Sequence, residues 1–201
     1  MRRIVVGISG ATGAPLAVRV LEFLRDLDVE VHLIVSQWAR ATLLQECGIR
    51  AEDLTVYAHQ MHHPSDQAAT ISSGSFLTEG MIIVPCSMKT LAAVRCGYAD
   101  NLIARAADVT LKERRRLVLV PRETPLNPIH LENALELSRI GATIFPPTPG
   151  FYNRPASIED VVDHLAVRIL DQFGLDHPAA RRWEGMKAAG NVTNHELAEA
   201  I

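Results

Sequence analysis

Two short, uninterrupted apolar runs, Met81–Val84 and Leu117–Val120, constrain the fold more than any other feature of this sequence. A strand that is apolar at every position is typical of a parallel sheet, because helices cover such a sheet on both faces. A third run, Arg3–Ile8, is rich in β-branched residues and leads into the glycine-rich segment Gly7–Gly13. A longer segment with helical spacing follows each run. The sequence therefore predicts alternating strands and helices in a doubly wound α/β sheet with three layers.

The remaining elements are expected from apolar spacing and from capping residues. Further strands are predicted at 29–35, 55–58 and 142–145. Helices are predicted from Pro15 onward and at 37–46, 90–97, 101–114, 127–141 and 158–173. Proline is expected to end three strands, at Pro85, Pro121 and Pro146. The sequence after about Gly174 is expected to be a weakly specified tail.

Composition excludes several classes of protein. Apolar residues make up 48% of the 201 residues and charged residues 21%, which excludes a disordered chain. The net charge of −3 gives no basic field that would attract nucleic acid or an anionic membrane. The apolar runs are too short to span a bilayer. Three cysteines without a C-x-x-C pair fit a reducing cytoplasm and argue against a structural zinc site, so neither a membrane location nor a metal is expected.

The glycine-rich turn after the first strand is the first candidate ligand site. Its spacing is G-x-x-G-x-x-G, through Gly7, Gly10 and Gly13, and it leads into a helix whose first N–H groups can bind a phosphate. A tight turn without a ligand is the alternative. The second strand ends at Ser36, where a dinucleotide site would often carry an acidic residue. A mononucleotide or a flavin therefore fits better than a dinucleotide.

Two further segments follow buried strands. Ser87 and Thr90 can cap the next helix or offer hydroxyl groups to a ligand. Arg122 can hold a phosphate through two hydrogen bonds, and the neighbouring Glu123 can move a proton. Both segments are expected at the carboxyl edge of the sheet, where ligands bind in this class of fold.

Three residues near the end of the chain have a structural and a functional interpretation. Tyr152 either covers the edge of the core or faces a ligand. Arg168 lies among apolar residues and needs an anionic partner, either a carboxylate or a bound anion. Trp183 either anchors the tail by packing or belongs to the site. The histidines at 59, 62 and 63 lack carboxylate or cysteine partners and are not expected to bind a metal.

In combination, these motifs resemble the UbiX/Pad1 family of flavin prenyltransferases. The resemblance covers about residues 2–183, which we expect to form one flavoprotein domain (1–183) with a tail at 184–201. The segment 69–76 is similar to the branch of this family that is associated with hydroxyaryl acid decarboxylases. The motifs that carry the family resemblance are Gly10–Ala14, Pro85–Thr90, Asn101–Val109, Leu111–Arg115, Val120–Pro125 and Pro149–Tyr152.

The resemblance implies a flavodoxin-like (Rossmann-type) fold and a transferase that needs no metal. Such an enzyme joins dimethylallyl phosphate to N5 and C6 of reduced FMN. The prenylated FMN then serves a UbiD-type decarboxylase. The resemblance further implies a cytoplasmic homododecamer whose sites form between subunits.

The family's functional positions carry over to this sequence residue by residue. The positions that contact FMN are Gly10, Ala11, Thr12, Ser36, Ser87, Met88, Lys89, Thr90 and Arg122. Tyr152 and Arg168 match positions that bind dimethylallyl phosphate. Further phosphate-side positions are Arg105, Lys112 and Glu123, and further active-site positions are Glu46 and Trp183. Thr12 departs from the usual serine; its hydroxyl is kept, but its methyl group narrows the pocket.

Two other functions remain open from the sequence. A related flavin-dependent decarboxylase would need a histidine just after the first helix and an Asn-Met motif after a strand, and neither is found. An FMN-binding electron-transfer protein would give no reason for Lys112, Arg122 and Arg168 to occur together. The sequence does not determine the chain length of the prenyl donor, or whether the donor is a monophosphate or a diphosphate.

Overall fold

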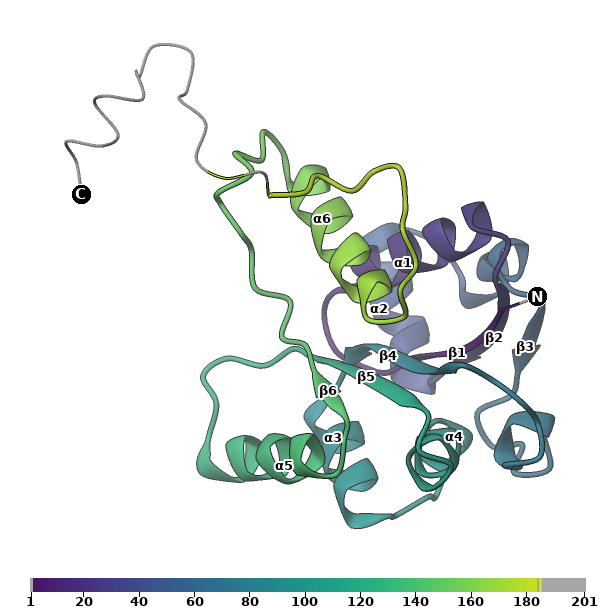
Figure 1. Cartoon of the computed structure of the whole chain (residues 1–201). Helices are drawn as coiled ribbons and strands as arrows, with labels where there is room; N and C mark the ends of the chain where they lie inside the picture. Colours follow the sequence, from purple (N-terminus) through teal and green to yellow (C-terminus); the bar gives the residue numbers. More distant parts are fainter. Residues whose placement is uncertain (1, 184, 186–201) are drawn as a thin grey trace, which may run out of the picture.

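The computed structural model describes residues 2–183 and 185, and within them the chain forms one six-stranded parallel sheet (Figure 1). The strands lie in the order β3-β2-β1-β4-β5-β6. Their bounds are β1 Arg3–Ile8, β2 Glu30–Val35, β3 Gln60–His62, β4 Gly80–Cys86, β5 Arg116–Pro121 and β6 Thr143–Ile144. The doubly wound α/β prediction is confirmed.

Helices cover both faces of this sheet (Figure 1). One face packs against α1 (Ala14–Asp26), α2 (Gln37–Cys47) and α6 (Ile158–Asp171). The other packs against α3 (Met88–Cys96), α4 (Leu102–Lys112) and α5 (Pro128–Arg139). In β1, Ile4, Val6 and Ile8 face the first set of helices and Val5 faces the second, as the two-residue period of a strand requires. This is the predicted three-layer arrangement.

Most of the helices are preceded by a residue with a short polar side chain. In each case the side-chain oxygen accepts a hydrogen bond from a backbone N–H of the first turn, as is typical of a helix N-cap. These residues are Ser36, Ser87, Asn101, Asn127 and Ser157. The caps predicted at Asn127 and Ser157 are therefore confirmed.

The strand predicted at 55–58 is wrong. Residues Ala51–Tyr57 form a 3-10 helix, and the strand β3 comes later, at Gln60–His62. The 3-10 helix begins where the Asp53 carboxylate accepts a hydrogen bond from the Arg50 N–H at 2.8 Å. Local hydrogen bonding of this kind outweighs the β propensity of a run as short as Thr55–Ala58.

Two further expectations need correction. Pro85 lies inside β4 rather than ending it, and the pairing with β5 shifts register between Ile83 and Cys86. The tail is not weakly specified directly after Gly174, because Leu175 and His177 are buried. The His177 ring stacks on Phe23 of α1 with ring centroids 3.8 Å apart. The predicted tail at 184–201 lies outside the described residues except for residue 185.

No helix in the described part of the chain combines the length and the apolarity that a membrane span requires.

A buried histidine pair lies between β2 and β3. His32 Nδ1 and His62 Nε2 are 2.8 Å apart, and His32 Nε2 lies 3.1 Å from the Glu30 carboxylate. Burial lowers the pKa of both rings below the usual 6.5. The hydrogen bond from Arg3 lowers the pKa of Glu30 to about 2, so Glu30 stays ionised while the histidines titrate.

This pair predicts a loss of stability in mild acid. A histidine with a lowered folded pKa binds its proton more readily in the unfolded chain, so stability is full above 6.5 and falls as the pH drops toward the folded pKa. We expect the free energy of unfolding in urea to fall between about pH 7.5 and about pH 5.5. His62→Gln should make this dependence shallower, whereas His63→Gln, at an exposed position, should not. Equal slopes in both variants would contradict the assignment.

Candidate active site

A cleft of about 670 Å³ opens at the carboxyl edge of the sheet, where the chain order reverses between β1 and β4. Ligands bind at such a switch point because the loops of the two neighbouring strands diverge there. The volume lies within the about 300–1,000 Å³ that is common for small-molecule sites. The lining residues are Ser9, Gly10, Ser36, Gln37, Trp38, Arg40, His63, Pro64, Ser65, Ser87, Lys89, Thr90, Asp100, Asn101 and Ile103.

Ser9 ties together the two loops that form the floor of the cleft. Its hydroxyl donates to the Pro85 carbonyl at 2.9 Å and accepts from the Ser87 N–H at 2.7 Å. The side chain is buried, so both hydrogen bonds are shielded from water. Ser9 was not predicted as a site residue, although a hydroxyl side chain directly after an apolar strand could have indicated it.

Two glycines shape the turn after β1. A Cβ on Gly10 would lie 2.4 Å from the Cβ of Trp38, so only glycine lets the loop pass this close to α2. Gly13 has a φ of 115°, a left-handed conformation that strains other residues. Trp38 is 76% exposed and forms a wall of the cleft, a role that its sequence position did not reveal.

The start of α1 does not offer free N–H groups to a phosphate, so this part of the prediction is wrong. The N–H groups of Gly13 and Ala14 both donate to one oxygen of the Glu46 carboxylate, at 2.9 and 2.8 Å. Pro15 has no N–H, and the next two amides donate to the Gly13 carbonyl. A carboxylate from α2 thus occupies the place where we expected an anionic ligand.

The N-termini of α2 and α3 face the cleft instead. Ser36 accepts from the Ala39 N–H at 3.2 Å, and Ser87 accepts from the Thr90 N–H at 3.3 Å. The capping interpretation of Ser87 is therefore confirmed, and its hydroxyl also donates to Thr90 Oγ1 at 3.0 Å. That proton can rotate to a ligand oxygen without breaking the cap. Two positive helix ends and the Lys89 side chain make this end of the cleft suitable for an anion.

The predicted flavin contacts divide into two groups. Gly10, Ser36, Ser87, Lys89 and Thr90 line the cleft. Ala11, Thr12 and Met88 are close in sequence to lining residues but do not line the cleft themselves, and Arg122 does not line it either. Arg122 follows β5, and its N–H donates to the Cys86 carbonyl at 3.3 Å, which places it next to the loop after β4. Glu123 is exposed beside Arg122.

A second cluster joins the loop after β6 to α6 and the segment that follows it. Tyr152 Oη lies 3.1 Å from Nε2 of His164, and the Tyr152 ring packs edge-on against Trp183 with centroids 5.5 Å apart. Arg168 lies one helical turn after His164 and pairs with Asp171 at 2.5 Å. The structure brings the rings of Tyr152 and Trp183 into contact, and Arg168 follows His164 on α6. None of the three lines the cleft.

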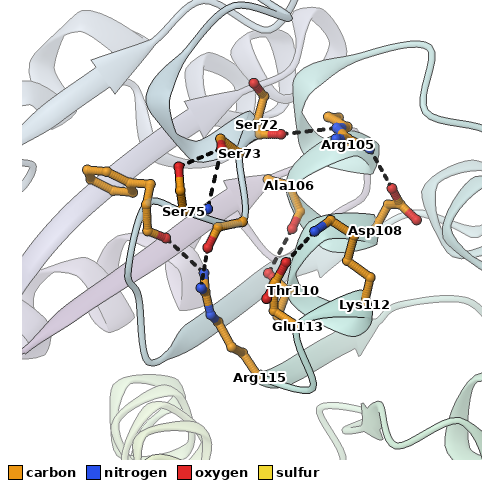
Figure 2. Close-up of polar contacts among 12 residues, drawn as sticks. Ser72, Ser73, Ser75, Arg105, Ala106, Asp108, Thr110, Lys112, Glu113 and Arg115 are labelled. Atoms are coloured by element: carbon orange, nitrogen blue, oxygen red, sulfur yellow. Dashed lines mark hydrogen bonds and ion pairs between the residues drawn. The ribbon is translucent and has the colours of Figure 1, made fainter.

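Arg105 and Lys112 form a third group, on α4 (Figure 2). Arg105 donates to the Ser72 carbonyl at 3.2 Å and to Asp108 at 2.8 Å, while Lys112 pairs with Glu113. Asn101 at the start of α4 lines the cleft, but Lys112 lies eleven residues later, about 16 Å along the helix axis. Lys112 therefore lies far from the cleft of its own protomer.

The buried cysteine beside the cleft is not a nucleophile. Complete burial raises the pKa of the Cys86 thiol to about 12, so the thiolate is absent at neutral pH. Within the described residues no group of three or more histidine, cysteine, aspartate or glutamate side chains is placed to hold a metal ion.

Comparison with known proteins decides the family. Residues 1–170 match the family model described as Flavoprotein. A probable UbiX-like flavin prenyltransferase from a Streptomyces species is 63% identical over 188 residues, which cover 93% of this chain and 94% of that protein. The chain belongs to the UbiX-like flavin prenyltransferase family.

Two solved structures from this UbiX-like family share the fold closely. AnUbiX (PadA1), whose crystal structure contains FMN and dimethylallyl pyrophosphate, is 55% identical with a TM-score of 0.91 over 92% of this chain and 99% of that one. A dodecameric FMN-dependent UbiX-like decarboxylase from Escherichia coli is 59% identical with a TM-score of 0.90 over 91% of this chain and all of that one. The resemblance found in the sequence is confirmed.

The contact between Glu46 and α1 gives a testable expectation for this UbiX-like protein. Glu46→Ala leaves two helix N–H groups without a partner and removes a charge that favours the helix dipole. We expect it to lower the free energy of unfolding by about 1–2 kcal/mol. Glu46→Gln keeps an oxygen acceptor and should cost less. Gln45→Ala, at an exposed position on the same helix, is the control in urea unfolding. A cost for Glu46→Ala no larger than the control's would refute the cap.

Proposed function

We infer that the protein is a flavin prenyltransferase, which joins the dimethylallyl group of dimethylallyl phosphate to N5 and C6 of reduced FMN. The observation that carries this inference is the cleft at the β1–β4 switch point, in a chain 55% identical to a protein whose crystal structure contains FMN and dimethylallyl pyrophosphate. The allylic carbon–oxygen bond breaks and phosphate leaves. N5 and C6 each form a bond to carbon and each lose a proton, and one proton adds to the former carbon–carbon double bond.

The cleft fits the FMN moiety by its shape and its polarity. Gly10 lines the cleft and, because it has no side chain, lets the loop after β1 pass close to Trp38. The hydroxyl groups of Ser36 and Ser87, the two helix N-termini and Lys89 supply donors for the FMN phosphate. When bound, FMN supplies the nucleophilic atoms N5 and C6. The protein's own side chains hold it, exclude water and place the second substrate.

The second substrate needs cationic and hydrogen-bonding groups of its own. Cleavage of an allylic phosphate leaves a phosphate dianion and a delocalised carbocation, and fixed positive charges stabilise the leaving group. We assign Tyr152, Arg168 and Lys112 to this phosphate, with Arg105 and Arg122 as further phosphate-side groups. We assign Glu123 as the acceptor of the C6 proton. The aromatic faces of Tyr152 and Trp183 can stabilise the cation, and Glu46 supports the loop after β1.

In a single chain these groups lie apart from the cleft. This supports an assembly in which groups from different copies of the chain form one site. Lys112 and the Tyr152 cluster do not line the cleft of their own chain. Large apolar side chains lie exposed around α5 and α6, including Leu126, Ile129, Leu135, Phe151 and Ile158. Apolar side chains that are exposed in an isolated chain become buried where they lie at an interface between subunits. We assign them to contacts between copies of this chain in a homododecamer, the assembly named for the Escherichia coli relative.

The product's use and the cellular location follow from the family resemblance alone. We assign prenylated FMN to a UbiD-type decarboxylase as its recipient, and the protein to the cytoplasm.

A decarboxylase of the same fold is the second candidate, because the Escherichia coli relative carries that name. It is disfavoured by the absence from the sequence of a histidine just after the first helix and of an Asn-Met motif after a strand. An FMN-binding electron-transfer protein would bind FMN without consuming a prenyl donor.

Mass spectrometry of the flavin separates these functions. The protein is incubated without oxygen with reduced FMN and dimethylallyl phosphate, and separately with the diphosphate. A prenyltransferase increases the flavin mass by one dimethylallyl unit. An unchanged flavin mass with both donors would overturn the proposed function. A mass increase with only one of the two donors would show whether the leaving group is phosphate or diphosphate.

Arg168→Ala tests the assignment of the donor site. Removing one guanidinium from the phosphate should lower prenylation at least tenfold, because a hydrogen bond to a charged group contributes about 1.5–3 kcal/mol. FMN affinity, measured by flavin fluorescence, should stay unchanged, since Arg168 does not line the cleft. Arg95→Ala, an exposed arginine in the last turn of α3, is the control. Normal turnover in Arg168→Ala would remove this residue from the donor site.

A further inference from the structure

Three polar side chains form a hydrogen-bonded series that ends at the Tyr152 hydroxyl. Asn153 Nδ2 lies 3.0 Å from His164 Nδ1, and His164 Nε2 lies 3.1 Å from Tyr152 Oη. The series connects the loop after β6 to α6. Neither Asn153 nor His164 was expected at the site from the sequence.

The direction of the first bond is fixed by a backbone carbonyl. Asn153 Nδ2 also lies 3.4 Å from the Arg181 carbonyl oxygen, which can only accept a hydrogen bond. The Asn153 amide therefore points its NH₂ group, and not its oxygen, toward both Arg181 and His164. One of its two protons is directed at His164 Nδ1, which must accept.

The direction of the second bond follows from the first. A neutral imidazole that accepts at Nδ1 carries its proton on Nε2. His164 Nε2–H then donates to Tyr152 Oη. The phenol oxygen uses one lone pair in this bond, so its own proton stays free. In the opposite tautomer, the Tyr152 hydroxyl would donate its single proton to His164 Nε2 and could not donate to a ligand.

The surroundings of His164 keep the ring neutral. Burial lowers its pKa, and the positive charges of Arg168 and Arg182 lower it further, while Asp171 opposes them. Asp160, Asp163 and Arg181 line a small cavity next to the ring, from α6 and from the segment that follows it. The Tyr152 ring also makes an edge contact with Trp183, which restricts the orientation of the ring.

We propose that His164 is a positioning residue, which holds the Tyr152 hydroxyl as a hydrogen-bond donor to the phosphate of the prenyl donor. A phosphate oxygen only accepts hydrogen bonds, so a tyrosine that serves it must keep its proton available. The same arrangement places the Arg168 guanidinium one helical turn away. This inference rests on the proposed function, because it assigns Tyr152 to that phosphate.

Substitution of His164 separates positioning from packing. His164→Leu removes the Nε2–H donor that orients the Tyr152 hydroxyl. It should raise the KM for dimethylallyl phosphate about fivefold, the effect of losing one neutral hydrogen bond, with FMN affinity unchanged. His164→Gln places an amide N–H near the former Nε2 and should restore most of the donor affinity. His59→Leu, at an exposed position, is the control. Equal effects of His164→Leu and His164→Gln, or no effect of either, would overturn the proposal.

The ring tautomer can be measured without any turnover. In full-length protein with isotopically labelled histidine nitrogens, the signal that disappears in His164→Gln is that of His164. The proposal requires a protonated Nε2 and an unprotonated Nδ1 at neutral pH, and the other tautomer or a doubly protonated ring would overturn it. If wild-type protein has this tautomer but forms no prenylated flavin, the proposed function fails while the tautomer assignment stands.

Discussion

Burial of the parallel sheet on both faces is the constraint on which the rest of the structure depends. Because α1, α2 and α6 cover one face and α3, α4 and α5 the other, neither face is left for a ligand. Most of the residues that line the cleft therefore lie in the segments that follow the strand ends. The reversal of strand order between β1 and β4 then opens the cleft at one place along the carboxyl edge.

The helix N-termini near this cleft are satisfied in two different ways. Glu46 satisfies the start of α1 from within the chain, whereas the starts of α2 and α3 face the cleft. Ser9 holds the loops after β1 and β4 in one position, so the two helix ends keep a fixed relation. The cleft is accordingly preorganised by hydrogen bonds that involve no ligand.

Apolar runs and capping residues were sufficient to predict the layers, most helices and the place of the cleft. Those signals are local, and they agree with the global packing. Two of the errors came from contacts between distant segments. The carboxylate on α1 comes from Glu46, more than thirty residues away, and the burial of His177 depends on Phe23. Asn153 and His164 were missed because their role depends on a tautomer, which only the three-dimensional arrangement fixes.

The central claim is that the flavin cleft and the donor cluster meet between copies of the chain. Co-expression of two impaired variants tests it most directly. Lys89→Glu places a negative charge in the cleft, and an acidic residue in the first turn of α3 also stabilises that helix. Arg168→Ala removes the guanidinium that we assign to the phosphate of the prenyl donor. The account predicts that mixed assemblies prenylate FMN faster than either variant does alone. Mixed assemblies that are no faster than the parents would show that each protomer contains its whole site.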